Sequence, residues 1–475
     1  MIATGQQTDR RGRAGSAVES ALAGGIRERG DETRDRDDPA RAREDERPDH
    51  RLIPVATAAW VGSWLGTSGE LKLIMVGAGL VLLTLIAVAI RRSWLLGSTA
   101  ITLAGVLTVG CLHQLALSGT QVSRLARSGA VVTVDLVITD DPSAQPSDGI
   151  RPPYLTVHGT VLRLTGRGQD WRERAPVLIT ASGDATRSWQ QLPVGSTVRL
   201  TSRLDRAQPG SDVAAVVRAI GPPTITSRPG ISARQIERVR AGLRRAVARG
   251  TPDQRALVPS LVLGDTAGIT PQIKADFLAT GLTHLTAVSG ANLAILIAFL
   301  MIIARWLGVR GWWLRVVGLG AVVVFVMLCR TEPSVLRAAA MGLVALAALG
   351  MSGRARGLRS LWVAMLILLI IDPWLGRSLG FALSVLATGG IIWWAGRWVR
   401  AMRRWSPRIV AESIAVPLAA HLATLPLAAA ISGQVSMIGI LTNAVAGPFV
   451  GPATVLGFAA AGSSLLSSTL AGWVG

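Results

Sequence analysis

Long apolar runs alternate with short charged segments along most of this chain. The runs at residues 71–90, 95–117 and 285–304 are almost free of charge, and each is close to the length that crosses a ~30 Å hydrocarbon layer. This pattern predicts a polytopic α-helical membrane protein with about ten membrane segments. The predicted segments lie at 52–66, 71–90, 95–117, 285–304, 316–329, 335–350, 361–371, 378–395, 409–431 and 436–460.

Several of these segments are too short to span a membrane or are interrupted by glycine or proline. The run at 361–371 is the clearest short example. Inside a membrane, broken helices are tolerated only where they are buried in protein or line a cavity. We therefore expect some segments to be re-entrant and the second membrane block, residues 257–475, to contain a pathway.

Residues 118–230 change to short runs rich in valine, threonine and leucine. The runs VVTVDLVI, YLTVHGTVLRL, PVLITAS, STVRLTS and DVAAVVRAI are separated by glycine, proline and aspartate. Strands at this spacing predict a small OB-like β-barrel inserted between the membrane blocks. The segment is basic, with Arg163, Arg167 and Arg172 close together, so it could bind nucleic acid or rest on anionic lipid. Trp171 could stack on bases or pack at an interface.

Charge placement predicts the orientation of the chain. Arginines follow or precede alternate apolar runs, and basic residues concentrate in cytoplasmic loops. The clusters are Arg91 and Arg92; Arg305, Arg310 and Arg315; Arg354, Arg356 and Arg359; and Arg397, Arg400, Arg403, Arg404 and Arg408. We expect a multi-pass plasma-membrane protein with a cytoplasmic N-terminus and an extracytoplasmic barrel.

The remaining segments complete the predicted domain organisation. Residues 1–51 mix arginine with acidic residues and contain no aromatic residue, which predicts a disordered cytoplasmic tail without a signal peptide. Residues 52–117 form about three transmembrane helices. Residues 231–256 alternate arginine with apolar residues, as in an amphipathic basic helix on a membrane surface. The net charge of +20 is carried almost wholly by arginine, which suits phosphate binding or reflects a GC-rich genome.

The stretch GLTHLTAVSGANLAILIAFL places His284, Ser289, Gly290 and Asn292 at the start of an apolar helix. Polar groups there are costly unless they are paired or functional. Ser289 and Gly290 could equally form a helix cap and a close backbone approach. A serine nucleophile with His284 as base would need an orienting carboxylate that the sequence does not display.

Other polar residues punctuate the second block. Asp265 precedes this stretch, and Asp372 opens a later turn; Glu332, Ser334 and Arg337 lie in the loop RTEPSVLRAAA, where Glu332 and Arg337 could neutralise each other. Histidines and cysteines show no metal-ligand spacing, so we expect no metal and no cofactor. Cys111 and Cys329 lie in apolar runs, as core residues do.

These motifs, in this order, resemble the ComEC family of bacterial competence proteins. The similar stretches are GDTAGITPQIKADFLATGLTHLTAVSGANLAIL, EPSVLRAAAM, DPWLGRSLGFALSVLATGGI and HLATLPLAAAISGQVSMIGILTNAVAGPFVG, the last of which contains Asn443. Together they cover roughly residues 255–455. The chain departs from the family where Asn292 replaces a usual histidine.

The resemblance implies a channel that admits single-stranded DNA to the cytoplasm. Its implied partners are the lipid bilayer, single-stranded DNA, an external DNA receptor, a cytoplasmic helicase or translocase and further copies of the chain. Many family members also carry a metallo-β-lactamase-like nuclease domain, whose His-x-His-x-Asp motif is absent from this sequence. We therefore expect no enzymatic activity. A membrane-embedded hydrolase and a solute transporter stay open as alternatives.

Overall fold

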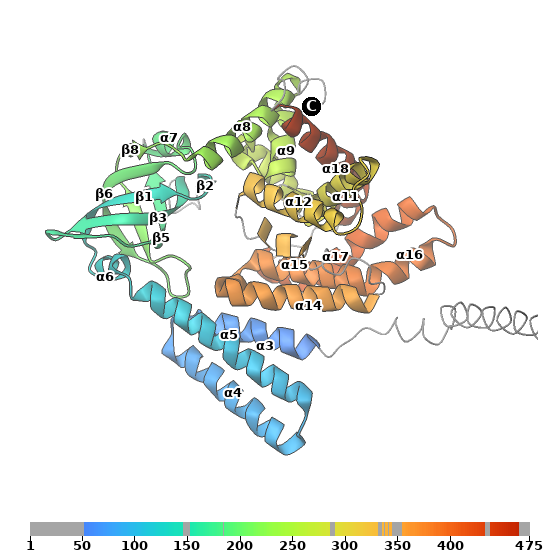
Figure 1. The fold of residues 1–475 in the computed structure, drawn as a ribbon, viewed down its shortest axis with the longest axis horizontal. Coiled ribbons are helices and arrows are strands. Elements are labelled where there is room, and N and C mark those ends of the chain that lie inside the picture. The colour runs from blue at the N-terminus through green and yellow to red at the C-terminus, as the bar shows by residue number, and fades with distance from the viewer. Residues whose placement is uncertain are drawn as a thin grey trace, which may run out of the picture. The chain divides into compact units, whose positions relative to one another are not determined.

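A computed structural model of the chain shows a β-barrel followed and preceded by helices (Figure 1). The chain divides into two compact units, of which the first, Met1–Asp49 with Met351–Leu358, falls almost entirely outside the described residues. The second unit, His50–Gly350 with Arg359–Gly475, holds the barrel and nearly all of the helices. The structure describes residues 52–145, 153–183, 185–285, 290–330, 335–336, 338–340, 342–343, 354–432 and 438–464.

Three apolar helices begin the described chain. They are α3 (Leu52–Gly66), α4 (Leu71–Arg91) and α5 (Trp94–Ser118). Helix α3 lies directly against α5 because Gly62 and Gly66 have no side chains to separate the two backbones. A Cβ atom on Gly66 would lie 2.6 Å from the carbonyl oxygen of Leu107. Small residues four positions apart are a common packing motif between membrane helices.

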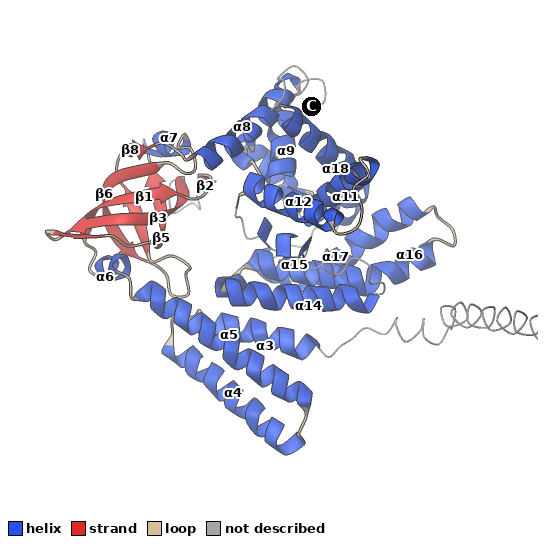
Figure 2. Ribbon diagram, viewed as in Figure 1, coloured by secondary structure: helices blue, strands red, loops and turns tan. Residues whose placement is uncertain are grey.

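A closed barrel follows, drawn as red arrows in Figure 2. Its strands are β1 (Val131–Ile138), β2 (Ser143–Gln145), β3 (Tyr154–Gly166), β4 (Gln169–Trp171), β5 (Ala175–Ser182), β6 (Thr197–Arg206), β7 (Ala215–Ala219) and β8 (Thr224–Ser227). The barrel closes in the order β1, β3, β5, β7, β6 and back to β1. Strands β5 and β7 run parallel, and the other pairs of this ring are antiparallel. These five strands coincide with the five runs from which the sequence predicts a barrel.

The barrel core forms because alternate residues of the five strands in the closed ring point inward. In β1, for example, Val132, Val134, Leu136 and Ile138 are all buried. The register between β1 and β3 shifts between Asp135 and Leu136, which leaves Leu162 of β3 as an extra residue; this bulge bends β3. Short helices α6 (Gln121–Arg127) and α7 (Ala185–Gln190) flank the barrel. Trp189 of α7 is fully buried and belongs to this core.

Helices make up the rest of the described chain. They are α8 (Ile231–Ala246), η1 (Val247–Arg249), α9 (Pro252–Leu263), η2 (Thr266–Gly268), α10 (Pro271–Ala279), η3 (Thr283–Leu285), α11 (Gly290–Trp306), α12 (Trp313–Cys329), α14 (Arg354–Ile371), η4 (Pro373–Arg377), α15 (Leu379–Gly390), η5 (Ile391–Ala395), α16 (Gly396–Met402), α17 (Arg408–Ser432) and α18 (Ile438–Ser463). Side chains of α3, α5, α14 and α15 share one apolar core, which joins the N-terminal helices to the second block.

The structure supports the predicted class, a mostly helical membrane protein with a small barrel. Among the described residues, five helices are long and apolar enough to cross a membrane: Leu71–Arg91, Trp94–Ser118, Leu379–Met402, Arg408–Ile431 and Leu441–Ser463. Four shorter apolar helices lie at Leu52–Gly66, Asn292–Trp306, Trp313–Cys329 and Gly357–Ile371. The apolar run predicted at 361–371 is part of a longer helix, α14, which begins at Arg354 in the preceding arginine-rich segment. The number of spans stays a prediction.

The close approach of α3 and α5 gives a stability test. We expect Gly66→Ala to lower the free energy of unfolding by about 1–3 kcal/mol, because the new methyl group overlaps the backbone of α5. The measurement is thermal unfolding of the detergent-solubilised protein. Gly105→Ala in α5 is the control, since a Cβ atom there meets nothing within 4 Å. Equal melting temperatures for both variants would contradict the packing described here.

A cross-strand ion pair on the barrel gives a pH test. Arg199 donates from Nε and Nη2 to the carboxylate of Asp135, at 2.6 and 2.8 Å, and these hydrogen bonds lower the pKa of Asp135. The pair therefore stabilises the folded state above the ordinary pKa of aspartate, about 3.9, and this contribution is lost as the pH falls through the lowered value. We expect Asp135→Asn to lower the urea midpoint at pH 7, and by progressively less as the pH falls below about 4, as followed by tryptophan fluorescence.

Candidate functional site

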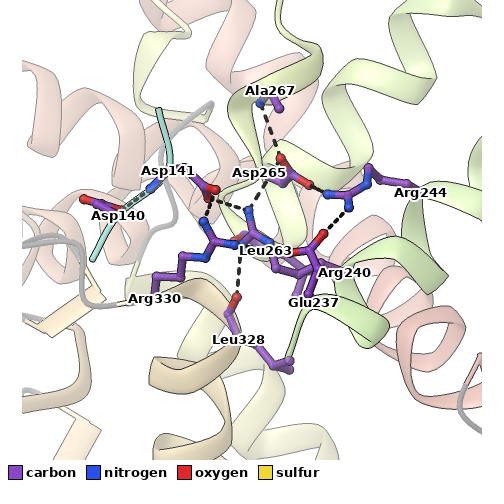
Figure 3. A network of polar contacts seen from close by, with 10 residues as sticks. All are labelled: Asp140, Asp141, Glu237, Arg240, Arg244, Leu263, Asp265, Ala267, Leu328 and Arg330. Atoms are coloured by element: carbon purple, nitrogen blue, oxygen red, sulfur yellow. Dashed lines mark hydrogen bonds and ion pairs between the residues drawn. The ribbon is translucent and has the colours of Figure 1, made fainter. Parts of the chain in front are cut away.

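Six charged side chains from distant parts of the chain meet where the barrel joins the helices (Figure 3). This cluster, called the junction network below, contains three arginines and three carboxylates, so its formal charges cancel. Its members are Asp141, Glu237, Arg240, Arg244, Asp265 and Arg330. Asp141 lies in the loop between β1 and β2, and the others lie in or beside α8, α9 and α12.

Arg240 is the centre of the junction network. Its side chain is only 1% exposed, and its guanidinium lies 2.8 Å from Oδ2 of Asp141 and 3.5 Å from Oδ1 of Asp265. It also donates to the carbonyl oxygens of Leu263 and Leu328, at 3.2 and 3.1 Å. One arginine thus connects a barrel loop to the ends of α9 and α12.

The other two arginines extend the network on either side. Arg244 pairs with Asp265 and with Glu237. Arg330 pairs with Asp141, and its Nη2 lies 3.2 Å from Oε2 of Glu237. Every carboxylate of the network therefore contacts two arginines, an arrangement in which no charge is buried without a partner.

Local sequence places these groups. Glu237, Arg240 and Arg244 are three and four residues apart, so they share one face of α8. Gly264 ends α9 in the left-handed conformation, with φ +69°, and turns the chain so that Asp265 caps η2. Asp265 is 3% exposed, and it accepts a hydrogen bond from the backbone N–H of Ala267 at 3.3 Å. The helix predicted to lie on a membrane surface therefore has one arginine buried inside the protein.

Asn292 forms a second buried polar contact nearby. Its side chain is 2% exposed, and its Nδ2 donates to the carbonyl oxygen of Leu261 at 2.7 Å. This bond joins α11 to α9 just before Asp265.

Gly290 begins α11, and His284 lies in η3. The side chain of His284 lies outside the described residues, as do Ser289, Glu332, Ser334 and Arg337.

Asp372 and Asn443 lie apart from the junction network. Asp372 caps η4, where its side chain accepts from the backbone N–H of Trp374 at 3.1 Å, and burial raises the pKa of its carboxyl. Asn443 donates to the carbonyl oxygen of Gly439 at 2.7 Å, within its own helix. Of the predicted channel residues, the structure brings Asp265 and Asn292 close to the same end of α9.

The basic residues predicted on the barrel separate into two places. Arg163 faces Asp135 across the β1–β3 pair. Arg167 and Trp171 lie together at the hairpin between β3 and β4, where they line a hollow beside α6. Arg172, one residue further, is exposed and is not part of that lining.

Five members of the junction network were not singled out by the sequence analysis. These are Asp141, Glu237, Arg240, Arg244 and Arg330. The acidic and basic residues at helical spacing in α8 were the available signal, but they fit a solvated face equally well. Within the described ranges, no three histidine, cysteine or acidic side chains come together as a metal-ion site.

The burial of Arg240 gives a third test. We expect Asp265→Ala to lower the free energy of unfolding by up to about 3–5 kcal/mol, because it leaves three arginines with two carboxylates and the buried Arg240 with Asp141 as its remaining counter-charge. Combining Asp265→Leu with Arg240→Met should cost less than the sum of the two single changes. Thermal unfolding measures both effects. Arg408→Gln, which breaks the exposed pair between Arg408 and Glu412, is the control and should leave the melting temperature unchanged.

Comparison with known proteins identifies the second half of the chain. The family described as competence protein matches residues 261–475. The ComE operon protein 3 of Bacillus subtilis (strain 168) is 29% identical over 216 residues, which make up 46% of this chain and 27% of that protein. The chain thus matches about a quarter of that relative's length. No solved structure matches the chain. The resemblance seen in the sequence is confirmed, and residues 261–475 form a domain of the competence protein family.

Proposed function

We propose that this chain forms a membrane channel through which single-stranded DNA enters the cytoplasm during competence. The observation that carries the proposal is the competence-protein domain at residues 261–475. An external DNA receptor and a cytoplasmic helicase or translocase would be its partners in this proposal. The geometry of the helices and of the barrel supports it in three ways.

Contacts at the C-terminal ends of α12 and α14 support an orientation with the barrel outside and the N-terminus in the cytoplasm. The C-terminal end of α12 contacts the barrel through Arg330 and Asp141. The turn after α14 contacts the end of α3, where Trp60 donates to Gly376 and Arg377 donates to Trp64, both at 2.8 Å. The arginine clusters lie at the opposite ends of α12 and α14, before each helix or in its first turns. With basic ends in the cytoplasm, the barrel and the turn after α14 are external and the N-terminus is cytoplasmic.

Broken helices support a path through the competence-protein domain. Helix α17 contains Pro417 and Pro426, α18 contains Pro448 and Pro452, and η5 is a π-helical segment. Each of these features frees backbone groups from the regular helical pattern. In a membrane such groups are stable only where they are buried in protein or face a hydrated cavity.

The barrel supports binding of a nucleic acid strand. Its closing order, its single parallel pair and the helix α7 between its third and fourth long strands are features of an OB-type barrel. Barrels of this type bind single strands by combining basic grooves with aromatic side chains. We therefore infer an OB-type barrel that holds the strand outside the membrane.

Transformation measures this function directly. We expect the chain to restore uptake of linear marker DNA in a transformable strain that lacks its own competence channel. The double variant Pro448→Ala, Pro452→Ala should insert normally yet give as few transformants as the deletion strain, because it restores the backbone hydrogen bonds that the two prolines remove from α18. Leu456→Ala, at an exposed position of the same helix, is the control. If the intact chain reaches the membrane of this deletion strain and still restores no DNA uptake, the proposal is wrong.

A further inference from the structure

The barrel carries a hollow that the channel proposal does not use. Its volume is about 420 Å³, within the range of small-ligand sites. It lies between α6, which directly follows α5, and the hairpin between β3 and β4. Its lining residues are Gln121, Arg124, Leu125, Ser128, Arg167, Gln169 and Trp171.

Arg167 stands in an unusual backbone conformation for its residue type. The hairpin turn consists of Arg167 and Gly168, with φ values of +51° and +76°. Glycine or asparagine is normally favoured at the first of these positions, because a side chain there crowds the backbone. The guanidinium of Arg167 reaches back across the hollow and donates from Nη2 to Oγ of Ser128 at 2.9 Å. Arg167 thus has a strained backbone and places its guanidinium in the hollow, and strained backbone is typical of functional positions.

The rest of the lining complements that cation. Trp171 is half-buried and packs partly against the barrel core, while it also lines the hollow. Arg124 supplies a second guanidinium from α6, and none of the described residues that line the hollow is acidic. The carboxylate of Glu173 is not part of the lining but lies beside it, where it accepts from the backbone N–H groups of Gln121 and Val122 at 2.7 and 3.4 Å.

We propose that this hollow binds one nucleotide of a single DNA strand. The indole of Trp171 stacks on the base, Arg124 and Arg167 bind the flanking phosphates, and the amides of Gln121 and Gln169 offer hydrogen bonds to the base edge. The inference rests on the proposed function for the identity of its ligand. A lipid phosphate is the competing occupant, because α6 begins three residues beyond the end of α5. Two amides and an indole face favour a base over a lipid headgroup.

Oligonucleotide binding tests this site. The probe is a fluorescent oligothymidylate, and the protein is the full chain in nanodiscs of zwitterionic lipid. We expect Trp171→Leu to weaken binding about five- to a hundredfold, since it keeps an apolar contact with the core but removes the stacking surface. Arg124→Gln and Arg167→Gly should also weaken binding, and each should reduce the steepness of its salt dependence by roughly 0.7 per lost phosphate contact.

Two comparisons separate binding from folding. Arg167→Gly should keep or raise the melting temperature while binding falls, because glycine adopts the left-handed conformation without strain. Arg187→Gln removes an exposed arginine of α7, outside the lining, and should leave binding unchanged.

The alternative outcomes are distinct. If the intact chain binds the strand and all three lining variants bind it equally well, the site proposal is overturned while the channel proposal stands. If the intact chain binds no strand, the proposed function fails together with the site. If the variants bind DNA normally but lose association with phosphatidylglycerol vesicles, the hollow is a lipid-headgroup site.

Discussion

Arg240 sets the strongest physical constraint on this structure. A guanidinium cannot lose its charge in a protein, so one that is 1% exposed must be surrounded by acceptors. Asp141, Asp265 and two carbonyl oxygens provide them, and these acceptors come from three parts of the fold: the barrel loop, the end of α9 and the end of α12. The barrel loop, α8, α9 and α12 therefore meet in one arrangement that satisfies the charge.

This constraint has a functional consequence under the channel proposal. A strand held by the barrel has to be delivered to the helices at a fixed position, and a charge-balanced network resists relative movement of the two parts. Asn292 strengthens the same region, because it joins α11 to the end of α9. A separate contact joins α3 to the turn after α14, where the guanidinium of Arg377 lies 4.9 Å from the centre of the Trp64 ring.

Glycine and proline have opposite roles in the helices. Gly62 and Gly66 bring α3 and α5 into close contact, which stabilises helices that have no hydrophobic driving force in lipid. The prolines of α17 and α18 interrupt hydrogen bonding in the competence-protein domain. Close packing in the N-terminal helices thus accompanies irregular backbone in the part proposed to conduct DNA.

The sequence by itself determined the class of the protein, the five barrel strands and the family of its second half. Those features depend on local patterns: apolar runs of membrane length, alternation of valine and threonine, and ordered motifs. It also indicated Asp265 and Asn292 as unusual polar residues. Only the tertiary structure decided that Asp265 pairs with Arg240, that Arg330 meets Asp141, and that Arg167 and Trp171 share a hollow with Arg124. These contacts join residues far apart in the chain, and a charged residue at a helical position has the same local pattern whether it faces water or a buried partner.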